Sequence, residues 1–193
     1  MNYTVIIVTG DYYPRQEAAR AAGALLYIEV HGNADEDPTA DGACCVLPLD
    51  PTPASLALGL QLAHVAAERA PHRLLREGGL RLGGKGWANV DPDRTGCPSA
   101  LWEPGFVSCL AYDDWCRARG LHLLGMGLAA TVRGALPRGG VVALSIGHEG
   151  RTSHPDDRGA PRVGGGWESE HNAEIVRVAA GALGRMTAPG VGR

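Results

Sequence analysis

Three apolar segments of the chain each lead into a side chain that can bind a metal ion or transfer a proton. These side chains are His31, Glu103 and His148. A fourth candidate, Glu168, follows a glycine-rich stretch and begins a segment with helical spacing of its apolar residues. Because open α/β sheets bind their ligands beyond the carboxyl ends of the strands, we expect these four residues to meet at one edge of one sheet.

Two histidines and one carboxylate form a common ligand set of catalytic zinc sites, in which water takes the fourth tetrahedral position. A further carboxylate near the metal is then free to transfer protons. Each residue alone also has a simpler interpretation. A histidine at a strand end often forms only hydrogen bonds, and a glutamate in a first helical turn interacts favourably with the helix dipole. The short HExxH spacing of many zinc hydrolases is absent. The evidence for a zinc site is therefore that all four candidate residues are expected at the same edge of the sheet.

The segments that position these residues alternate between two kinds. Short apolar runs rich in β-branched residues predict strands at 3–9, 25–30, 43–47, 99–102 and 141–146. Apolar residues at helical spacing predict helices at 15–22, 53–69, 113–136 and 168–183. This alternation predicts an α/β fold with a twisted, mostly parallel sheet and helices on both faces. Glycine-rich loops are expected at 32–42, 77–96 and 150–166, and the last dozen residues are expected to form a frayed end.

Length and composition narrow the class of protein. A chain of 193 residues predicts a single domain, 1–193. With 18 Lys and Arg against 21 Asp and Glu, no basic surplus favours nucleic acid as a partner. No apolar run approaches the roughly 20 residues of a membrane helix, and the amino terminus lacks signal-peptide features, so we expect synthesis in the cytoplasm without membrane insertion. The 5 cysteines form no CxxC pair and are expected to be reduced thiols.

Several segments resemble motifs of a known enzyme family. LLYIEVHGNA at 25–34 resembles the FISIHANA strand and loop of the zinc-dependent N-acetylmuramoyl-L-alanine amidases of the type-three amidase family. PSALWEPGFVS at 98–108 resembles that family's PAVLVELGFIS. Residues 7–20 match the family's strand, turn and helix, with Gly10 where arginine is usual, and 55–60 match the segment after the histidine loop.

The family's opening segment stands at the other end of this chain. VVALSIGHEG at 141–150 resembles the opening strand and its Gly-His-Gly-Gly turn, and ESEHN at 168–172 resembles the EKDVN helix start. Placing 141–183 before Tyr3 restores the family order, so the resemblance implies a circular permutation with a new connection at 134–140. Permutation is physically plausible because the ends of a domain usually lie close together at the surface.

The resemblance implies a role for each candidate. His31, His148 and Glu168 would be the zinc ligands, and Glu103 would be the catalytic glutamate. Bound Zn²⁺ lowers the pKa of water from 15.7 to about 7, which provides a nucleophile at neutral pH. Glu103 would accept the proton of the attacking water and deliver it to the departing amine of L-alanine.

Some assignments at the site remain open in the sequence. Glu168 is preferred as the ligand because it lies four residues before Asn172, as the family's glutamate lies before its asparagine. Glu170 and His171 are the alternatives. Glu149, which replaces a glycine of the family turn, would either accept a hydrogen bond from an imidazole N–H or be solvated.

The implied substrate is the amide bond between N-acetylmuramic acid and L-alanine in peptidoglycan, so the partner would be the glycan strand with its peptide stem. Arg94 and Lys85 are candidates to contact carboxylates of the stem. Tryptophans at 87, 102 and 167 are candidate sugar contacts where they are not buried.

The expected setting is a phage endolysin that is made in the host cytoplasm and acts on the cell wall after release. A bacterial amidase is the competing origin. Two other functions stay open: a zinc carboxypeptidase-like hydrolase of a different amide bond, and an inactive zinc-stabilised module that only binds peptidoglycan.

Overall fold

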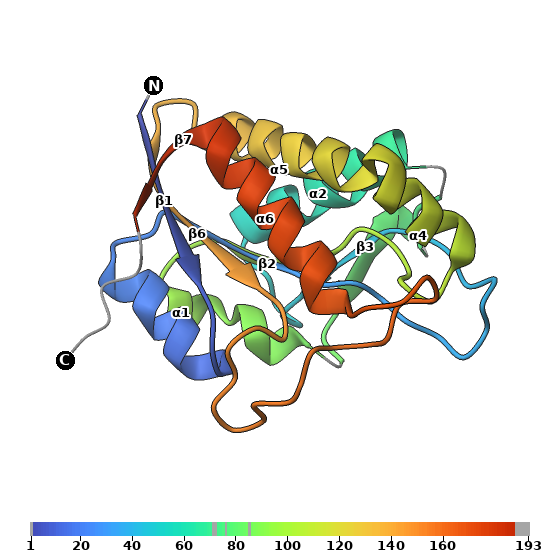
Figure 1. Cartoon of the computed structure of the whole chain (residues 1–193). Coiled ribbons are helices and arrows are strands. Elements are labelled where there is room, and N and C mark those ends of the chain that lie inside the picture. The colour runs from blue at the N-terminus through green and yellow to red at the C-terminus, as the bar shows by residue number, and fades with distance from the viewer. Residues whose placement is uncertain (1, 71–72, 76, 85, 188–193) are drawn as a thin grey trace.

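One seven-stranded sheet forms the centre of the protein (Figure 1). The computed structural model describes residues 2–70, 73–75, 77–84 and 86–187. The strand order across the sheet is β4-β3-β5-β2-β6-β1-β7. The strands are β1 (Tyr3–Val8), β2 (Leu26–Val30), β3 (Cys44–Leu47), β4 (Leu80–Leu82), β5 (Ser99–Glu103), β6 (Gly140–Ile146) and β7 (Gly184–Thr187).

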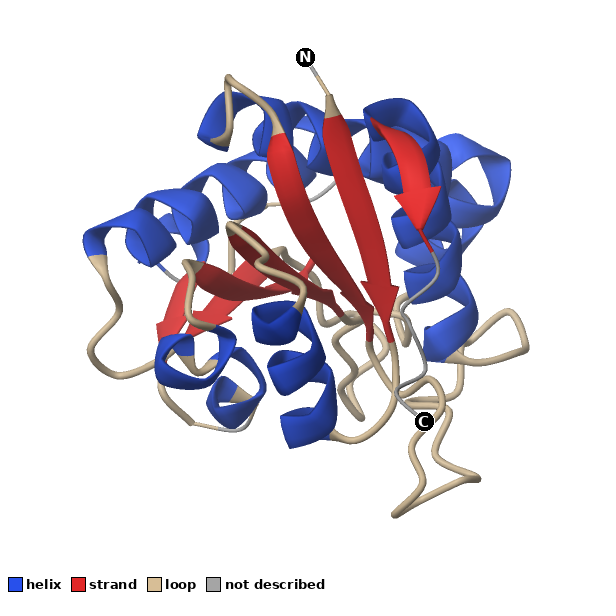
Figure 2. Ribbon diagram, turned by 90° about the vertical axis from the view of Figure 1, so that its left-hand side faces the viewer, coloured by secondary structure: helices blue, strands red, loops and turns tan. Residues whose placement is uncertain are grey.

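Helices cover both faces of this sheet. Helices α2, α5 and α6 pack on one face, and α1 lies on the other beside α3 and the 3-10 turn Trp87–Val90 (Figure 1). The helices are α1 (Tyr12–Ala21), α2 (Pro53–Arg69), α3 (Pro92–Thr95), α4 (Leu110–Trp115), α5 (Leu121–Ala135) and α6 (Glu168–Leu183). Single turns of 3-10 helix lie at Glu77–Gly79 and Trp87–Val90, and a π turn lies at Cys116–Gly120. The predicted α/β class is confirmed, and the view after a 90° turn shows the twist of the sheet (Figure 2).

The direction of the strands brings distant parts of the sequence together. Strands β5, β2, β6, β1 and β7 run parallel, whereas β3 is antiparallel to β5 and β4 follows the direction of β3. Val30 at the end of β2 is in register with Ile146 at the end of β6. His31 and His148 follow these two ends, so the prediction that both runs lead to the same edge of the sheet is confirmed.

Two apolar cores, one on each face of the sheet, hold these strands in place. The larger core lies under α2, α5 and α6 and includes the fully buried Trp102 and Leu144. The smaller core lies under α1 and includes Val46 and Ala143. Strand β2 is buried over its whole length, which explains why it appears in the sequence as an apolar run interrupted only by Glu29.

Individual side chains determine where α2 begins and where a π turn interrupts the helix that was predicted at 113–136. Helix α2 begins as predicted, because the Thr52 side chain accepts a hydrogen bond from the Ser55 N–H at 3.1 Å and proline occupies the first turn. The single helix predicted at 113–136 is wrong in one respect: the π turn separates α4 from α5. A Cβ at Gly120 would lie 2.3 Å from the Trp115 ring, so this glycine lets the ring lie against the helix backbone.

Two edge strands were not predicted. Strand β7 pairs with β1 in the region expected to be a frayed end, and residues 188–193 of that expectation lie outside the described residues. Strand β4 lies inside the glycine-rich segment 77–96. Both are short and pair mainly through backbone groups, so neither needs an apolar pattern.

The described helices include none with the length and apolarity that a membrane span requires. The cysteines at 44, 45, 97, 109 and 116 are all free and buried.

Candidate metal centre and active site

Three of the four predicted site residues form one cluster. The ligand atoms of His31, His148 and Glu168 all lie within 4.8 Å of one another. Glu168 Oε1 is 3.1 Å from His31 Nδ1 and 3.4 Å from His148 Nε2. A tetrahedral site with bonds of about 2.0–2.2 Å needs ligand atoms roughly 3.4 Å apart. The donor set and its dimensions therefore fit a zinc ion.

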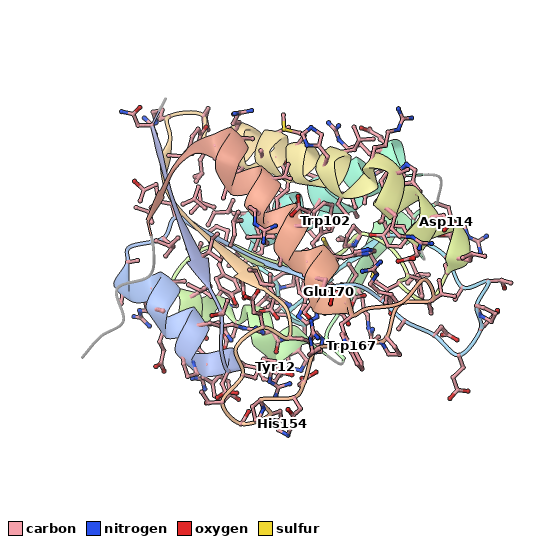
Figure 3. The ribbon with its side chains drawn as sticks, viewed as in Figure 1. Tyr12, Trp102, Asp114, His154, Trp167 and Glu170 are labelled. Carbon is pink, nitrogen blue, oxygen red and sulfur yellow. The ribbon has the colours of Figure 1, made fainter. Side chains whose placement is uncertain are left out.

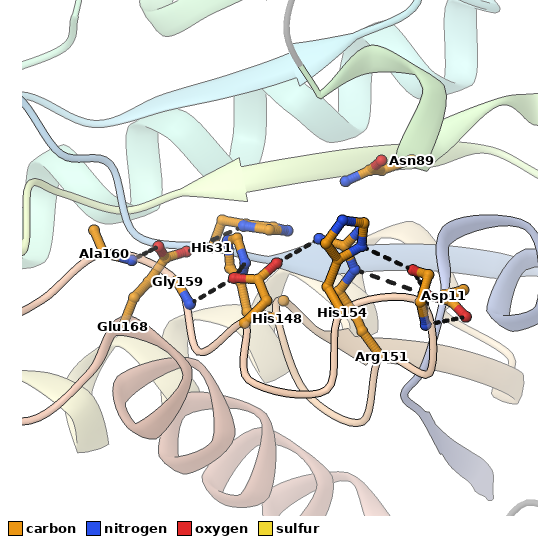
Figure 4. A network of polar contacts seen from close by, with 12 residues as sticks. Asp11, His31, Asn89, His148, Arg151, His154, Gly159, Ala160 and Glu168 are labelled. Carbon is orange, nitrogen blue, oxygen red and sulfur yellow. Dashed lines mark hydrogen bonds and ion pairs between the residues drawn. The ribbon is translucent and has the colours of Figure 1, made fainter.

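Backbone groups of two loops hold the Glu168 carboxylate in place (Figure 4). The N–H of Gly32 donates to Oε1 at 2.9 Å, and the N–H of Ala160 donates to Oε2 at 3.0 Å. A Cβ at Gly159 would lie 2.5 Å from Oε2, so only glycine lets this loop approach so closely. Burial alone would raise the pKa of Glu168, but hydrogen bonds from His148 and His31 lower that pKa below its usual range. The carboxylate is thus ionised and ready to bind a cation.

The far nitrogen of His31 contacts a second carboxylate. His31 Nε2 is 2.6 Å from Glu29 Oε1, and Glu29 is fully buried. Glu29 also forms an ion pair with the buried Arg15 and accepts hydrogen bonds from the Tyr27 hydroxyl and the Asn89 amide, each at 3.0 Å. A carboxylate on this nitrogen fixes the tautomer and orientation of a metal-binding imidazole. It therefore leaves Nδ1 of His31 to face the metal.

The charge around His31 favours a cation at this position. Burial would lower the pKa of His31, but hydrogen bonds to Glu168 and Glu29 outweigh it and raise the pKa to about 10. The metal-free site therefore binds a proton between two carboxylates. The same excess of negative charge attracts a divalent cation, whose binding would release that proton.

His148 is held in a comparable way from a different loop. Its Nδ1 is 2.8 Å from Asp157 Oδ1, and Asp157 also forms an ion pair with Arg151. Among the described residues, His148 alone has a positive φ without being a glycine, and its φ is 64°. Such a conformation costs on the order of 1–3 kcal/mol and persists where the surrounding structure imposes it. Asp157 thus takes the partner role considered for Glu149, whose side chain is exposed.

Glu103 lies outside the ligand cluster but lines the same pocket of about 900 Å³ as the three candidate ligands. The residue is at the end of β5, opposite Cys44 in the antiparallel pair with β3. The Cys44 thiol donates a hydrogen bond to Glu103 Oε2 at 3.0 Å. A carboxylate in this position can exchange protons with a substrate held at the metal.

The alternative ligands lie away from the cluster. Glu170 forms ion pairs with Arg158 at 2.9 Å and Arg162 at 3.1 Å on the outer side of the first turn of α6 (Figure 3). His171 is buried, with its Nε2 3.6 Å from Asp113 Oδ1. The structure therefore brings Glu168, and neither alternative, to the two histidines.

None of the described candidate substrate contacts lines the pocket that holds the three candidate ligands. The Arg94 guanidinium lies 3.8 Å from the centroid of the Tyr13 ring and lines a separate pocket. Lys85 lies outside the described residues. Trp102 is fully buried, and its backbone carbonyl accepts a hydrogen bond from the His31 N–H at 2.9 Å, whereas Trp87 and Trp167 are 41% and 39% exposed.

The carboxylates behind the two histidines were not predicted. Glu29 had a signal in the sequence: it is a charged residue within an apolar run, on the same face of the strand as His31, and it stands in the place of the serine of FISIHANA. Asp157 had no such signal, because it belongs to a loop without periodicity.

Comparison with known proteins supports the fold. No protein-family model and no curated protein sequence matches the chain. The catalytic domain of CwlV, an N-acetylmuramoyl-L-alanine amidase from Bacillus (Paenibacillus) polymyxa var. colistinus, matches with a TM-score of 0.51 at 18% identity over 66% of each chain. Ami1 from Mycobacterium smegmatis, an N-acetylmuramyl-L-alanine amidase, matches with a TM-score of 0.55 at 17% identity over 65% of this chain and 60% of its own.

A third structure covers more of its own length. The N-acetylmuramoyl-L-alanine amidase from Clostridium difficile 630 matches with a TM-score of 0.53 at 14% identity over 71% of this chain and 98% of its own. For CwlV and Ami1 the match spans less than two thirds of those chains. The protein therefore has a single-domain α/β fold like that of amidase catalytic domains, with a candidate metal centre where β2 and β6 end.

Proposed function

We propose that this protein is a zinc-dependent N-acetylmuramoyl-L-alanine amidase that hydrolyses the bond between N-acetylmuramic acid and L-alanine in peptidoglycan. The observation that carries the proposal is the cluster of His31, His148 and Glu168, with Glu103 in the same pocket. The motifs that match the type-three amidase family in cyclic order support it, as does the likeness of fold.

The residues divide the chemistry between them. His31, His148 and Glu168 would hold Zn²⁺, which polarises a carbonyl and acidifies water when bound. Glu29 and Asp157 orient the two imidazoles through their far nitrogens. Glu103 accepts a proton from the attacking water and later donates it to the amine nitrogen of alanine, so that the C–N bond breaks and a carboxylic acid and a free amine result.

We further propose that the chain is a circular permutation of the family order. The end of α6 lies beside the start of β1, because Gly184 is in register with Tyr3. A short connection there would join β6, α6 and β1 into one parallel unit. At the other junction, a tight turn in which the Gly139 N–H donates to the Leu136 carbonyl at 2.9 Å links α5 to β6. Both junctions support the order inferred from the motifs.

The products of hydrolysis test the proposed activity. Incubation of purified peptidoglycan with the zinc-loaded enzyme is expected to produce stem peptides with a free amino-terminal alanine, detected by amine labelling and mass spectrometry. Release of a carboxy-terminal amino acid instead would support the carboxypeptidase-like alternative and contradict the amidase. Binding without any cleavage would support the inactive binding module.

A Glu103→Gln variant tests the assignment of the proton-transfer group. We expect the rate to fall by about 10²–10⁴-fold because the amide cannot accept the proton. The zinc content should be unchanged, because Glu103 is not in the ligand cluster. Glu17→Gln, an exposed position on α1, is the matched control. A Glu103→Gln enzyme as fast as wild type would contradict the assigned role.

The proposed setting is lysis of a bacterial host by phage, with the enzyme made in the host cytoplasm and released to the wall. Expression in the cytoplasm of a Gram-negative host tests this setting. We expect lysis only after the inner membrane is permeabilised, and none with Glu103→Gln. Intact cells after permeabilisation with the active enzyme present would contradict the proposal.

A further inference from the structure

Arg81 on β4 provides a positive charge in the wall of the active-site pocket. Among the described residues that line this pocket, no residue other than Arg81 has a guanidinium or ammonium group. Neighbouring guanidiniums are used by the protein itself, since Arg15 pairs with Glu29 and Arg151 with Asp157. The half-buried Arg81 has no hydrogen bond or ion pair within the described part of the chain, so its donors are available to a ligand.

The register of the sheet places Arg81 relative to the candidate ligands. Arg81 pairs with Val46, Val46 with Leu101, and Leu101 with Glu29, which contacts His31. These residues therefore form one row across a single face of the sheet. Three strand spacings of about 4.8 Å put the backbones of β2 and β4 roughly 14 Å apart, and the side chains at both ends shorten that gap.

The backbone next to Arg81 leaves room for the guanidinium. Gly84 has a positive φ of 78°, and a Cβ there would lie 3.2 Å from a terminal nitrogen of Arg81. A side chain at position 84 would thus crowd the guanidinium. The glycine-rich segment after β4 keeps this group against the loop and open to the pocket.

The other charges in the pocket make Arg81 decisive for an anionic ligand. Carboxylates of Asp35, Glu103, Asp157 and Glu168 line the same wall. These carboxylates disfavour an anion close to them, whereas a bound metal and Arg81 would attract it. An extended, negatively charged substrate would therefore be oriented with its reacting carbonyl toward the candidate metal ligands and a carboxylate toward Arg81.

We propose that Arg81 binds the free α-carboxylate of the second residue of the peptide stem, a glutamate linked through its side chain. This inference rests on the proposed function. In an extended stem, two residues span about 7 Å from the cleaved carbonyl. This length fits within the gap of roughly 14 Å between the backbones of β2 and β4 once the side chains at both ends shorten it. The structure thus assigns to the enzyme a preference for stems whose second residue carries a free acid over stems in which that acid is amidated.

Two synthetic substrates test this assignment. One is N-acetylmuramoyl-L-alanyl-D-glutamate, joined through the alanine nitrogen, and the other is its α-amide. We expect wild type to cleave the acid with about tenfold higher kcat/KM, a ratio typical of one charge-assisted hydrogen-bonding contact. Arg81→Gln should lose this preference through a higher KM for the acid, with a much smaller change in KM for the amide. Arg81→Lys should retain part of the preference, because it keeps the charge without the planar pair of donors.

Arg94→Gln is the matched control, because Arg94 lies against Tyr13 in a separate pocket. Calorimetric binding of the product dipeptides gives a readout that does not depend on turnover: the acid should bind wild type about tenfold more tightly than Arg81→Gln.

Three outcomes would overturn the inference: equal losses on both substrates in Arg81→Gln, no loss on either, or the same loss of preference in Arg94→Gln. Wild type that cleaves neither substrate would contradict the proposed function as well. Turnover of both without discrimination would remove only the role of Arg81.

Discussion

At the scale of single residues, the candidate site depends on carboxylates that do not belong to the ligand cluster. Glu29 is buried in the middle of β2, where a charge is costly unless it is paired and hydrogen-bonded. Arg15, Tyr27, Asn89 and His31 together provide those partners. The chain therefore keeps a buried ion pair at a place where it orients a candidate metal ligand.

Replacing Glu29 with glutamine should weaken zinc binding by about 10–100-fold, the usual effect of losing a carboxylate behind a metal-binding histidine. Competition with a chromophoric chelator measures this change. Because Arg15 is left buried without its partner, the variant should also unfold at a lower temperature.

The double variant Arg15→Met/Glu29→Gln separates these two effects. It removes the buried charge and should recover thermal stability while zinc binding stays weak. Wild-type zinc affinity in both variants would show that Glu29 does not orient His31.

The four candidate site residues were predictable because each follows a recognisable strand or begins a recognisable helix. Glu29 could have been found from its charge within an apolar run. Asp157 could not, since its position behind His148 depends on the path of a glycine-rich loop that has no periodic pattern.

At the scale of elements, the first turns of α6 connect the site to the rest of the molecule. Glu168 contributes to the ligand cluster, while His171 faces inward against the buried Asp113 of α4. Arg162, from the loop before α6, hydrogen-bonds to the same Asp113 at 2.9 Å. Burial and the charge of Arg162 lower the pKa of His171 to about 4.

This lowered pKa predicts an acid-sensitive contribution to stability. Folding favours neutral His171, so the contribution is complete above the unfolded pKa of about 6.5 and is lost as the pH falls from there toward about 4. The loss should reach about 3 kcal/mol in the free energy of unfolding. Urea unfolding of metal-free wild type and His171→Gln at pH 7.5, 5.5 and 4.5 measures the difference.

The wild-type advantage should shrink steadily across that series, because glutamine does not titrate. His64→Gln, exposed on α2, is the control and should parallel wild type. A difference that stays constant with pH would contradict the contribution of His171.

Helices α2 and α6 could be predicted because their apolar spacing and first-turn residues agree. The π turn could not, since it depends on the contact between the Trp115 ring and Gly120. Strand β7 could not either, because its pairing with β1 at the sheet edge needs no side-chain pattern.

At the scale of the whole molecule, the two imidazoles belong to residues 31 and 148, far apart in the sequence, and meet because β2 and β6 are neighbours. The sequence indicated this meeting through the cyclic order of its motifs. It did not indicate that β3 and β4 reverse the direction of the sheet, since an apolar run has the same appearance in either direction.

Restoring the family order tests the permutation at this scale. A chain that starts at Gly139 and joins Leu183 to Tyr3 through a short glycine linker should fold and bind zinc as the unaltered chain does. The linker can be short because Gly184, which follows Leu183, is in register with Tyr3. Circular dichroism and zinc content measure the outcome. A permutant with the same linker but opened at Gly159 should lose zinc, since that loop holds Glu168. Loss of folding in the first permutant would contradict the proposed relation.

Anomalous diffraction at the zinc edge, from crystals of the protein grown with zinc, tests whether His31, His148 and Glu168 bind one zinc ion. We predict one strong peak about 2.0–2.2 Å from His31 Nδ1, His148 Nε2 and Glu168 Oε1, with Glu103 close by but unbound. A peak elsewhere, or none at these three atoms, would contradict it.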